Sequence, residues 1–296
     1  MSEKAIEKEK KQYKKKSQGK EIWKRMKKNR AAMIGLVIIC IFVFFAIFAD
    51  VIADYEEEAI TQNVKERLQP PNSEHWFGTD AYGRDIFARI LHGARVSLTI
   101  GLASTGISVI LGGLFGAAAG YYGGKVDSII MRVMDTVMCI PAILLALAIV
   151  AALGPGIRNL LIAITVAQVP GFTRVIRSVI LSVVGQDFIE AAKACGTTDK
   201  RIIIKHILPN AMGPIIVQAT MSVAGMIITA AGLSFIGMGI QPPRPEWGAM
   251  LAESREYMRY APYLVAFPGI AIVLAALSLN LLGDGLRDAL DPRLKN

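Results

Sequence analysis

The sequence predicts an all-α integral membrane protein with six transmembrane helices, and three observations carry this prediction. Hydrophobic residues make up 53% of the chain and the mean hydropathy is +0.44, which is too apolar for a typical soluble domain. Apolar stretches long enough to cross roughly 30 Å of hydrocarbon recur along the chain. The net charge of +9 is concentrated before residue 31, directly ahead of the first of these stretches.

Residues 1–30 form a basic tail that we expect on the cytoplasmic side of the membrane. The tail contains thirteen Lys and Arg residues, which is a strong inward signal under the positive-inside rule. It is too long and too charged for a signal peptide. Because it leads straight into a membrane span, anionic lipid explains its charge better than nucleic acid does. A short interfacial helix is expected around Ile22, Trp23 and Met26.

The predicted spans follow in order along the chain. The first, 31–52, is an almost uninterrupted apolar run, and a polar outer loop, 53–95, separates it from the rest. The core transmembrane domain, 96–283, holds five further spans, and a charged tail, 284–296, ends the chain. Gly154-Pro155-Gly156 is a tight turn between two of these spans. The five spans are expected at about 96–121, 128–153, 159–180, 212–240 and 263–282.

The same charge rule predicts the orientation of the spans. With the N-terminus inside, six spans place both termini and the loop between the fourth and fifth spans in the cytoplasm. The segment 173–209 carries six basic residues that agree with this placement: Arg174, Arg177, Lys193, Lys200, Arg201 and Lys205.

The sequence contains no phosphate-binding loop and no catalytic constellation. No G-x-x-x-x-G-K-[ST] stretch exists, so the chain offers no nucleotide site of its own. Its three histidines and three cysteines stand at no metal-ligand or disulfide spacing. We therefore predict a non-catalytic chain without a bound cofactor or metal. Gly112, Gly116 and Gly120 are spaced by four and are better explained by close helix packing.

A polar island between apolar segments, 186–210, predicts two short helices with a break between them. A narrow apolar stripe recurs at helical spacing on the first helix: Phe188, Ala192 and Cys195. Gly196 is expected to stop this helix, because glycine readily takes the left-handed conformation of a helix C-terminus. Thr198 or Asp199 is expected to cap the second helix, and Pro209 marks the start of the next span. The residues alone leave two interpretations open, a docking surface for another protein and an ordinary loop.

Few polar residues fall inside the spans. Arg132 and Asp135 stand three apart in the third span, and we favour an ion pair along that helix over a cytoplasmic gate contact. Thr165 and Gln168 lie mid-span in the fourth helix, where they either line a translocation path or hydrogen-bond to a neighbouring helix. Prolines that would permit bending occur in four spans: Pro141, Pro170, Pro214 and Pro268.

The outer loops carry a second group of candidate residues. Asp80, Arg84 and Asp85 precede three apolar residues that share one helical face: Ile86, Ile90 and Leu91. The nearby arginines are available to lipid headgroups or acidic partners: Arg84, Arg89 and Arg95. We favour a membrane-anchored connector with solvated charges for this segment, and an interfacial helix that shapes the outer gate is the alternative. Trp247, in the second outer loop, is expected to be an interfacial anchor.

The island resembles the EAA motif of ABC importer permeases. Glu190-Ala191-Ala192, then Gly196, then Leu208-Pro209 match this motif, while His206 stands where the general pattern has isoleucine. The form H-I-L-P-N, from His206, is similar to the dipeptide/oligopeptide/nickel branch of the family. The chain beyond the basic tail resembles the DppC/OppC type of that branch, and the run from His75 to Leu98 is similar to the pattern the branch carries before its second span.

The resemblance implies a set of roles for these residues. The island would be the coupling helix that fits a groove on an ATPase, through Glu190, Ala191, Ala192, Gly196, Asp199, Arg201, Leu208 and Pro209. The outer gate or the contact with the binding protein would involve Asp80, Arg84, Asp85 and Trp247. The translocation path or gate would involve Arg132, Asp135, Thr165 and Gln168.

The resemblance also implies the partners and the solute. The chain would pair with a second, homologous permease and with two ATPase subunits that bind ATP and magnesium, in the plasma membrane of a prokaryote. An extracytoplasmic binding protein would deliver short peptides, with nickel as the alternative solute. A hypothesis from a different class, a stand-alone ion-coupled transporter, expects a carboxylate buried mid-membrane, and Asp135 is the nearest candidate.

Overall fold

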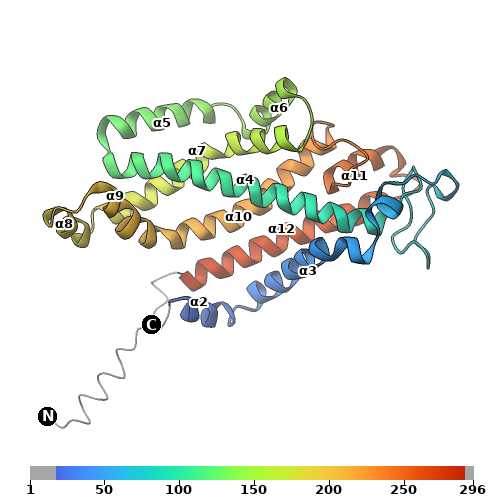
Figure 1. Cartoon of the computed structure of the whole chain (residues 1–296), viewed down its shortest axis with the longest axis horizontal. Helices are drawn as coiled ribbons and strands as arrows, with labels where there is room; N and C mark the ends of the chain where they lie inside the picture. The colour runs from blue at the N-terminus through green and yellow to red at the C-terminus, as the bar shows by residue number, and fades with distance from the viewer. Residues whose placement is uncertain (1–17, 291–296) are drawn as a thin grey trace, which may run out of the picture.

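The computed structural model describes residues 18–290, which form an elongated bundle of long helices (Figure 1). Apart from one isolated β-bridge between Thr79 and Asp85, the described residues form helices and their connections. The α-helices are α2 (Gln18–Met26), α3 (Arg30–Ile52), α4 (Ile86–Tyr122), α5 (Gly124–Met138), α6 (Ala142–Leu153), α7 (Ile157–Val184), α8 (Asp187–Ala194), α9 (Asp199–Ile202), α10 (Leu208–Phe235), α11 (Trp247–Ser254) and α12 (Tyr263–Leu290). One π-helical turn (Tyr55–Ile60) follows α3 and another (Ile203–Ile207) joins α9 to α10.

Within residues 18–290, five helices are long and apolar enough to cross a membrane: α3, α4, α7, the continuous run from α9 through α10, and α12. The predicted third span, 128–153, is not straight. Its two halves, α5 and α6, meet at an angle of 81° and count as a sixth span only if the bent pair is one crossing. Pro141 explains the break, because proline has no N–H to donate and disfavours helical conformation in the residue before it.

The second predicted span also differs from the structure, because α4 begins ten residues early. The Asp85 side chain caps the helix by accepting a hydrogen bond from the Ala88 N–H (2.9 Å). The alternative of an interfacial helix around Ile86, Ile90 and Leu91 is therefore wrong, since these residues lie in the first turns of α4.

Helix α4 packs against α7 along the line of glycines that the sequence singled out. A Cβ added to Gly112 would lie 2.6 Å from the Phe172 Cβ, and one added to Gly116 would lie 2.8 Å from the Thr173 carbonyl oxygen. A Cβ added to Gly120 would lie 2.9 Å from the Ile180 Cγ2. The prediction of close helix packing through these three glycines is confirmed.

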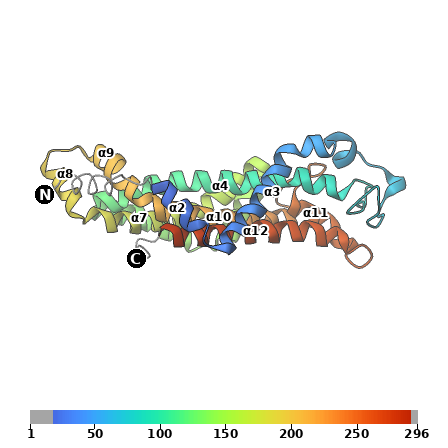
Figure 2. The ribbon, with the colours of Figure 1, turned by 90° about the horizontal axis from the view of Figure 1, so that it is seen from below.

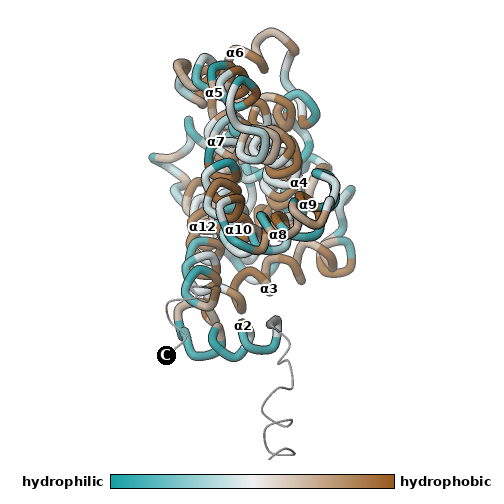
Figure 3. Tube along the Cα trace, turned by 90° about the vertical axis from the view of Figure 1, so that its left-hand side faces the viewer, coloured by the Kyte–Doolittle hydropathy of each residue, from teal (hydrophilic) through white to brown (hydrophobic). Residues whose placement is uncertain are grey.

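The remaining long helices complete the bundle around α10. Helix α10 lies between the α4–α7 pair and α12, and α3 covers the far side of α12 (Figures 1 and 2). Polar contacts at the two ends of α3 fix its position along the bundle axis relative to α12 and α4. Asn29 donates to the Asp288 carboxylate (3.2 Å) at one end, and Arg95 pairs with Asp50 (2.9 Å) at the other. Hydrophobic residues follow α3 along its length, whereas the short α2 is largely hydrophilic (Figure 3).

The two ends of the bundle carry different structures. Helices α8 and α9 extend from one end of the long axis, and the segment 53–85 with α11 forms a folded lobe at the other (Figure 1). We call this lobe, residues 53–92 and 241–262, the outer lobe, after the two predicted outer loops that form it.

We expect Gly116→Ala to destabilise the protein by about 1–3 kcal/mol, because the added methyl group overpacks the α4–α7 seam. The matched control is Gly106→Ala, on the same helix, where an added Cβ meets nothing within 4 Å. Thermal unfolding of the purified protein in detergent measures both. Equal melting temperatures for the two variants would show that the seam is not tightly packed.

Candidate functional sites at the two ends of the bundle

The loop 186–210 forms the two short helices that its sequence predicts. Helix α8 ends in a Schellman motif: the Gly196 N–H donates to the Lys193 carbonyl (2.9 Å) and the Thr197 N–H to the Ala192 carbonyl (3.1 Å). Gly196 has φ +70°, the left-handed conformation that favours glycine, so the predicted break is confirmed. Helix α9 then begins after Thr198, and α10 begins at Leu208 with Pro209 in its first turn.

Apolar residues anchor this loop to the bundle and leave its other face open. Ile189 is 0% exposed and packs, with Ile202 and Ile207, into the core cluster shared by α4, α7 and α10. The stripe expected from the sequence is divided between the two faces: Ala192 packs against this core cluster, whereas Phe188 is 44% exposed and Cys195 is also exposed. The outward face of the loop also carries Glu190, Ala191, Cys195 and Arg201, which are all exposed.

Asp135 pairs with a different partner from the one the sequence predicts. Its carboxylate accepts a hydrogen bond from Arg174 of α7 (2.7 Å), so the expected ion pair with Arg132 along α5 is wrong. One helical turn away, Arg177 and Asp127 form a two-pronged ion pair at 2.5 Å for both contacts. Both pairs join α5 to α7, and because α7 presents its arginines to α5, an interhelical contact replaces the local one.

The other path candidates occupy different environments. Thr165 is buried, and its carbonyl accepts a hydrogen bond from Ser108 of α4 (3.4 Å), so it lies in the α4–α7 seam. Gln168 is half-buried. Arg132 lines an open hollow of about 460 Å³ together with Ser128, Met131, Asp135, Thr136 and Cys139.

A second hollow, of about 410 Å³, opens between α7, α10 and α12. Sequence spacing gives no sign of this hollow, because its walls come from three helices far apart in the chain. Its lining is mostly apolar with two polar side chains: Val175, Gly213, Pro214, Val217, Gln218, Met221, Arg287 and Leu290.

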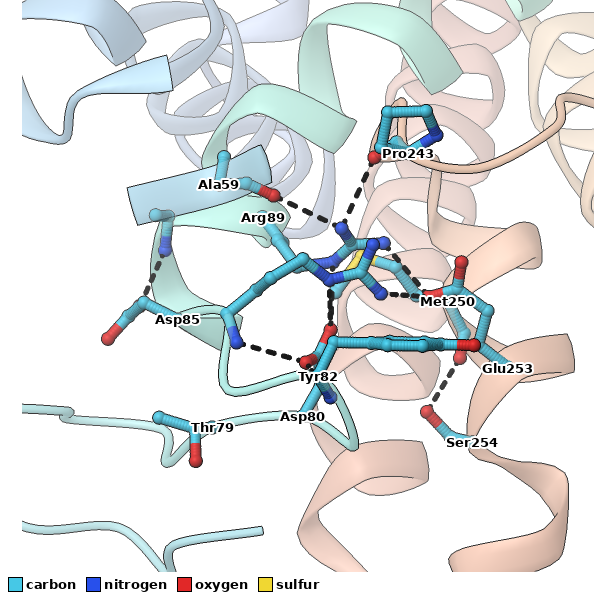
Figure 4. A network of polar contacts seen from close by, with 12 residues as sticks. Ala59, Thr79, Asp80, Tyr82, Asp85, Arg89, Pro243, Met250, Glu253 and Ser254 are labelled. Atoms are coloured by element: carbon cyan, nitrogen blue, oxygen red, sulfur yellow. Dashed lines mark hydrogen bonds and ion pairs between the residues drawn. The ribbon is translucent and has the colours of Figure 1, made fainter. Parts of the chain in front are cut away.

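In the outer lobe, a cluster of four charged side chains joins three segments of the chain (Figure 4). Arg84 and Arg89 are each 1% exposed. Both donate to the same oxygen of Glu253, at 2.6 and 3.1 Å, and Arg84 also pairs with Asp80 at 2.6 Å.

Further contacts satisfy both guanidinium groups. Arg89 donates to the backbone carbonyls of Ala59 (3.1 Å) and Pro243 (3.3 Å), and the Arg84 guanidinium lies 4.6 Å from the ring centroid of Tyr82. The cluster contains two positive and two negative groups, so its charge is balanced and its burial is physically reasonable.

Arg84 and Arg89 are therefore not solvated and do not face headgroups or another protein, so both interpretations are wrong for these two arginines. Their carboxylate partner Glu253 lies 164 or more residues further along the chain, where sequence spacing gives no hint of it. Arg95 is partly exposed and pairs with Asp50. Asp80 and Asp85 are also buried, and Asp85 contacts His75 at 2.7 Å.

Trp247 is not an interfacial anchor, because it is 0% exposed. Its ring nitrogen donates to the Ile90 carbonyl (3.1 Å), which holds α11 against α4. The preceding residue, Glu246, caps α11 by accepting hydrogen bonds from the Gly248 and Ala249 N–H groups at 2.9 and 2.8 Å. Burial raises the pKa of the Glu246 carboxyl above its usual range.

The structure thus places a folded lobe at one end of a bundle of membrane-length helices and an exposed two-helix loop at the other end. The chain belongs to the family of binding-protein-dependent transport system inner membrane components, whose profile matches residues 112–296. A second profile, the N-terminal transmembrane domain of oligopeptide transport permease C, matches residues 17–71. The protein is thus a multi-pass membrane protein of this family.

Its curated relatives match over nearly the whole chain. It is 49% identical over 287 residues to the dipeptide transport system permease protein DppC of Alkalihalophilus pseudofirmus, covering 96% of this chain and 93% of the relative. It is 46% identical over 275 residues to the glutathione transport system permease protein GsiD of Escherichia coli, covering 93% and 90%. Among solved structures, an inward-facing MetNI methionine ABC transporter matches with a TM-score of 0.57 at 18% identity, covering 70% of this chain and 98% of that one, which shows a shared fold.

We expect Gly196→Ala to weaken the end of α8 by about 1–2 kcal/mol, because an L-residue is strained at positive φ. Gly185→Ala is the matched control: this glycine flanks the other end of α8, also has open space around it, and has φ −81°. Gly196→Asn should restore much of the loss, since asparagine tolerates this conformation. Hydrogen exchange at the α8 amides measures the effect, and equal protection in the Gly196→Ala and Gly185→Ala variants would contradict it.

We expect Glu253→Gln to destabilise the outer lobe by about 3 kcal/mol, because it leaves two buried guanidinium groups without their shared carboxylate. The control is Glu256→Gln, an exposed position three residues further on. Limited proteolysis of the segment 53–85 in detergent provides the measurement. A lobe that stays equally resistant in both variants would show that Glu253 does not hold it together.

Proposed function

We propose that this protein is one permease subunit of an ATP-driven importer and forms half of a translocation path for short peptides. A second, homologous permease supplies the other half, and two ATPase subunits bind and hydrolyse ATP with magnesium. An extracytoplasmic binding protein delivers the peptide. The observation that carries the proposal is the exposed face of α8, with Glu190 and Ala191, on a loop that is rigidly anchored to the bundle through Ile189.

The choice of peptide as solute rests on the relatives. Three proteins that align with more than nine-tenths of this chain are named as permeases for dipeptides, di- and tripeptides, or glutathione, which is itself a tripeptide. Nickel, the alternative solute of the same mechanism, becomes an outcome of the transport test below.

The orientation we propose places both termini and the loop 186–210 in the cytoplasm. The basic α2 lies at the same end of the bundle as α8 and α9, and the outer lobe lies at the opposite end (Figure 1). Positive charge concentrates on the cytoplasmic side of membrane proteins, so the end with α2 faces inward. The outer lobe then faces the binding protein.

In this arrangement, the loop transmits the movement of the ATPases to the spans. Closure of the ATPase pair draws the α8 helices of the two permeases together, and the buried isoleucines of each loop carry that motion into α4, α7 and α10. The hollow between α7, α10 and α12, with Gln218 and Arg287, lines part of the path. We propose that the buried side chains Asp80, Arg84, Asp85 and Trp247 act on the contact with the binding protein indirectly, by shaping the outer lobe.

Co-purification from the native membrane tests the proposal. The tagged wild type should bring down ATPase subunits and a second permease. The double variant Glu190→Ala/Gly196→Val should lose the ATPases and keep the second permease, because it removes the exposed charge and strains the break after α8. The control Glu256→Ala/Gly185→Ala should retain both partners.

Two outcomes would contradict the proposal. A wild type that purifies alone would favour the stand-alone ion-coupled transporter, and a double variant that keeps its ATPases would make the loop an ordinary connector. Uptake into proteoliposomes with the co-purified binding protein then separates labelled dipeptide from labelled nickel as the solute.

A further inference from the structure

Tyr121, in the last turn of α4, contacts both halves of the loop 186–210. Its hydroxyl donates a hydrogen bond to the Asp199 carboxylate at the start of α9 (2.6 Å). Its ring lies 5.4 Å from the Lys193 ammonium on α8, within the range of a cation–π contact. Lys193 and Asp199 stand on opposite sides of the Gly196 break, so one side chain bridges the two short helices.

The position of Tyr121 is itself fixed by the bundle. One residue earlier, Gly120 packs directly against Ile180 of α7, because a Cβ added to Gly120 would lie only 2.9 Å from the Ile180 side chain. Gly123, with φ +64°, ends α4 two residues later. The phenol is therefore held on a rigid part of the bundle and reaches out to the loop.

Helix α4 differs from the other long helices that contact the loop or the path. Helices α7, α10 and α12 each contain an interior proline, at Pro170, Pro214 and Pro268, where a helix can bend. Helix α4 contains none over its 37 residues, a length of about 55 Å. Its first turn carries Arg89 in the buried charge cluster of the outer lobe, so the helix joins the cytoplasmic loop to that lobe without an interruption.

We propose that Tyr121 is a positioning residue that latches the coupling loop to α4, and that α4 is the strut that carries loop movement to the outer lobe. This inference rests on the proposed function. The latch holds α9 through Asp199 and steadies α8 through Lys193, so a displacement of α8 by the ATPase moves α4 instead of being absorbed at the Gly196 break.

A double-mutant cycle tests the latch. Tyr121→Phe keeps the ring and its contact with Lys193 but removes the hydrogen bond, and Asp199→Asn weakens the same bond from the other side. In proteoliposomes with the co-purified binding protein, we expect each variant to lower the number of solute molecules imported per ATP by roughly three- to tenfold, the size of one hydrogen bond. The combined variant should lose no more than either single variant, because both remove one interaction.

The neighbouring Tyr122→Phe is the matched control. Tyr122 is exposed. Removal of its hydroxyl group, one residue away from Tyr121, should leave the number of solute molecules imported per ATP at the wild-type value. A Tyr121→Phe variant that matches the wild type, or single effects that add in the combined variant, would overturn the latch. A Tyr121→Phe variant that no longer co-purifies with the ATPases would also overturn it, because Tyr121 would then act in docking.

Different measurements would contradict the two proposals. Failure of the proposed function is visible in the wild type, which would then import no solute in response to ATP. Failure of the latch is visible only in the comparison of variants, with the wild type importing normally.

Discussion

The close approach of α4 to α7 is the constraint on which the rest of the structure depends. Three glycines, Gly112, Gly116 and Gly120, bring the two backbones into direct contact over two turns near one end of the bundle. In a membrane, where lipid is as apolar as the side chains, such packing supplies much of the attraction between helices. The seam also fixes where Tyr121 stands, and α5 is tied across it by the ion pairs of Arg174 and Arg177. The loop, the α4–α7 seam and α5 are therefore connected through α7 and Tyr121.

The outer lobe is organised by a different force. Its core holds a charge-balanced cluster instead of a purely apolar one, with Glu253 accepting from Arg84 and Arg89 through one oxygen. Such a cluster contributes little net stability compared with apolar packing, but removal of any member leaves a buried charge without compensation. The cluster therefore favours one arrangement of the lobe. Its ion pairs form only when the segment after α3, the start of α4 and α11 are correctly positioned relative to one another.

Local signals predicted a large part of this structure. The glycine spacing in α4, the break at Gly196 and the start of α10 beside Pro209 depend on backbone conformation and helical periodicity, which neighbouring residues determine. The bend between α5 and α6 has a visible cause in Pro141, whereas its angle could not be predicted, because both helices also pack against the distant α7. The burial of Arg84 and Trp247 could not be predicted, because their partners lie far away in the sequence and a charge or a tryptophan near an outer loop is more often at the surface. The pairing of Asp135 with Arg174 was missed for the same reason.

The three cysteines are all exposed, and each occupies a distinct environment. Cys40 lies midway along the apolar α3, Cys139 lies at the bend between α5 and α6, and Cys195 follows α8 on the outward face of the loop. The native cysteines can therefore be labelled with thiol reagents to probe these three environments. A water-soluble maleimide can reach Cys195 in the aqueous phase but not Cys40 within lipid, and any partner that covers the loop will shield Cys195. The labelling rate of Cys195 therefore measures how far a bound partner covers the loop, in a protein that needs no engineered cysteine.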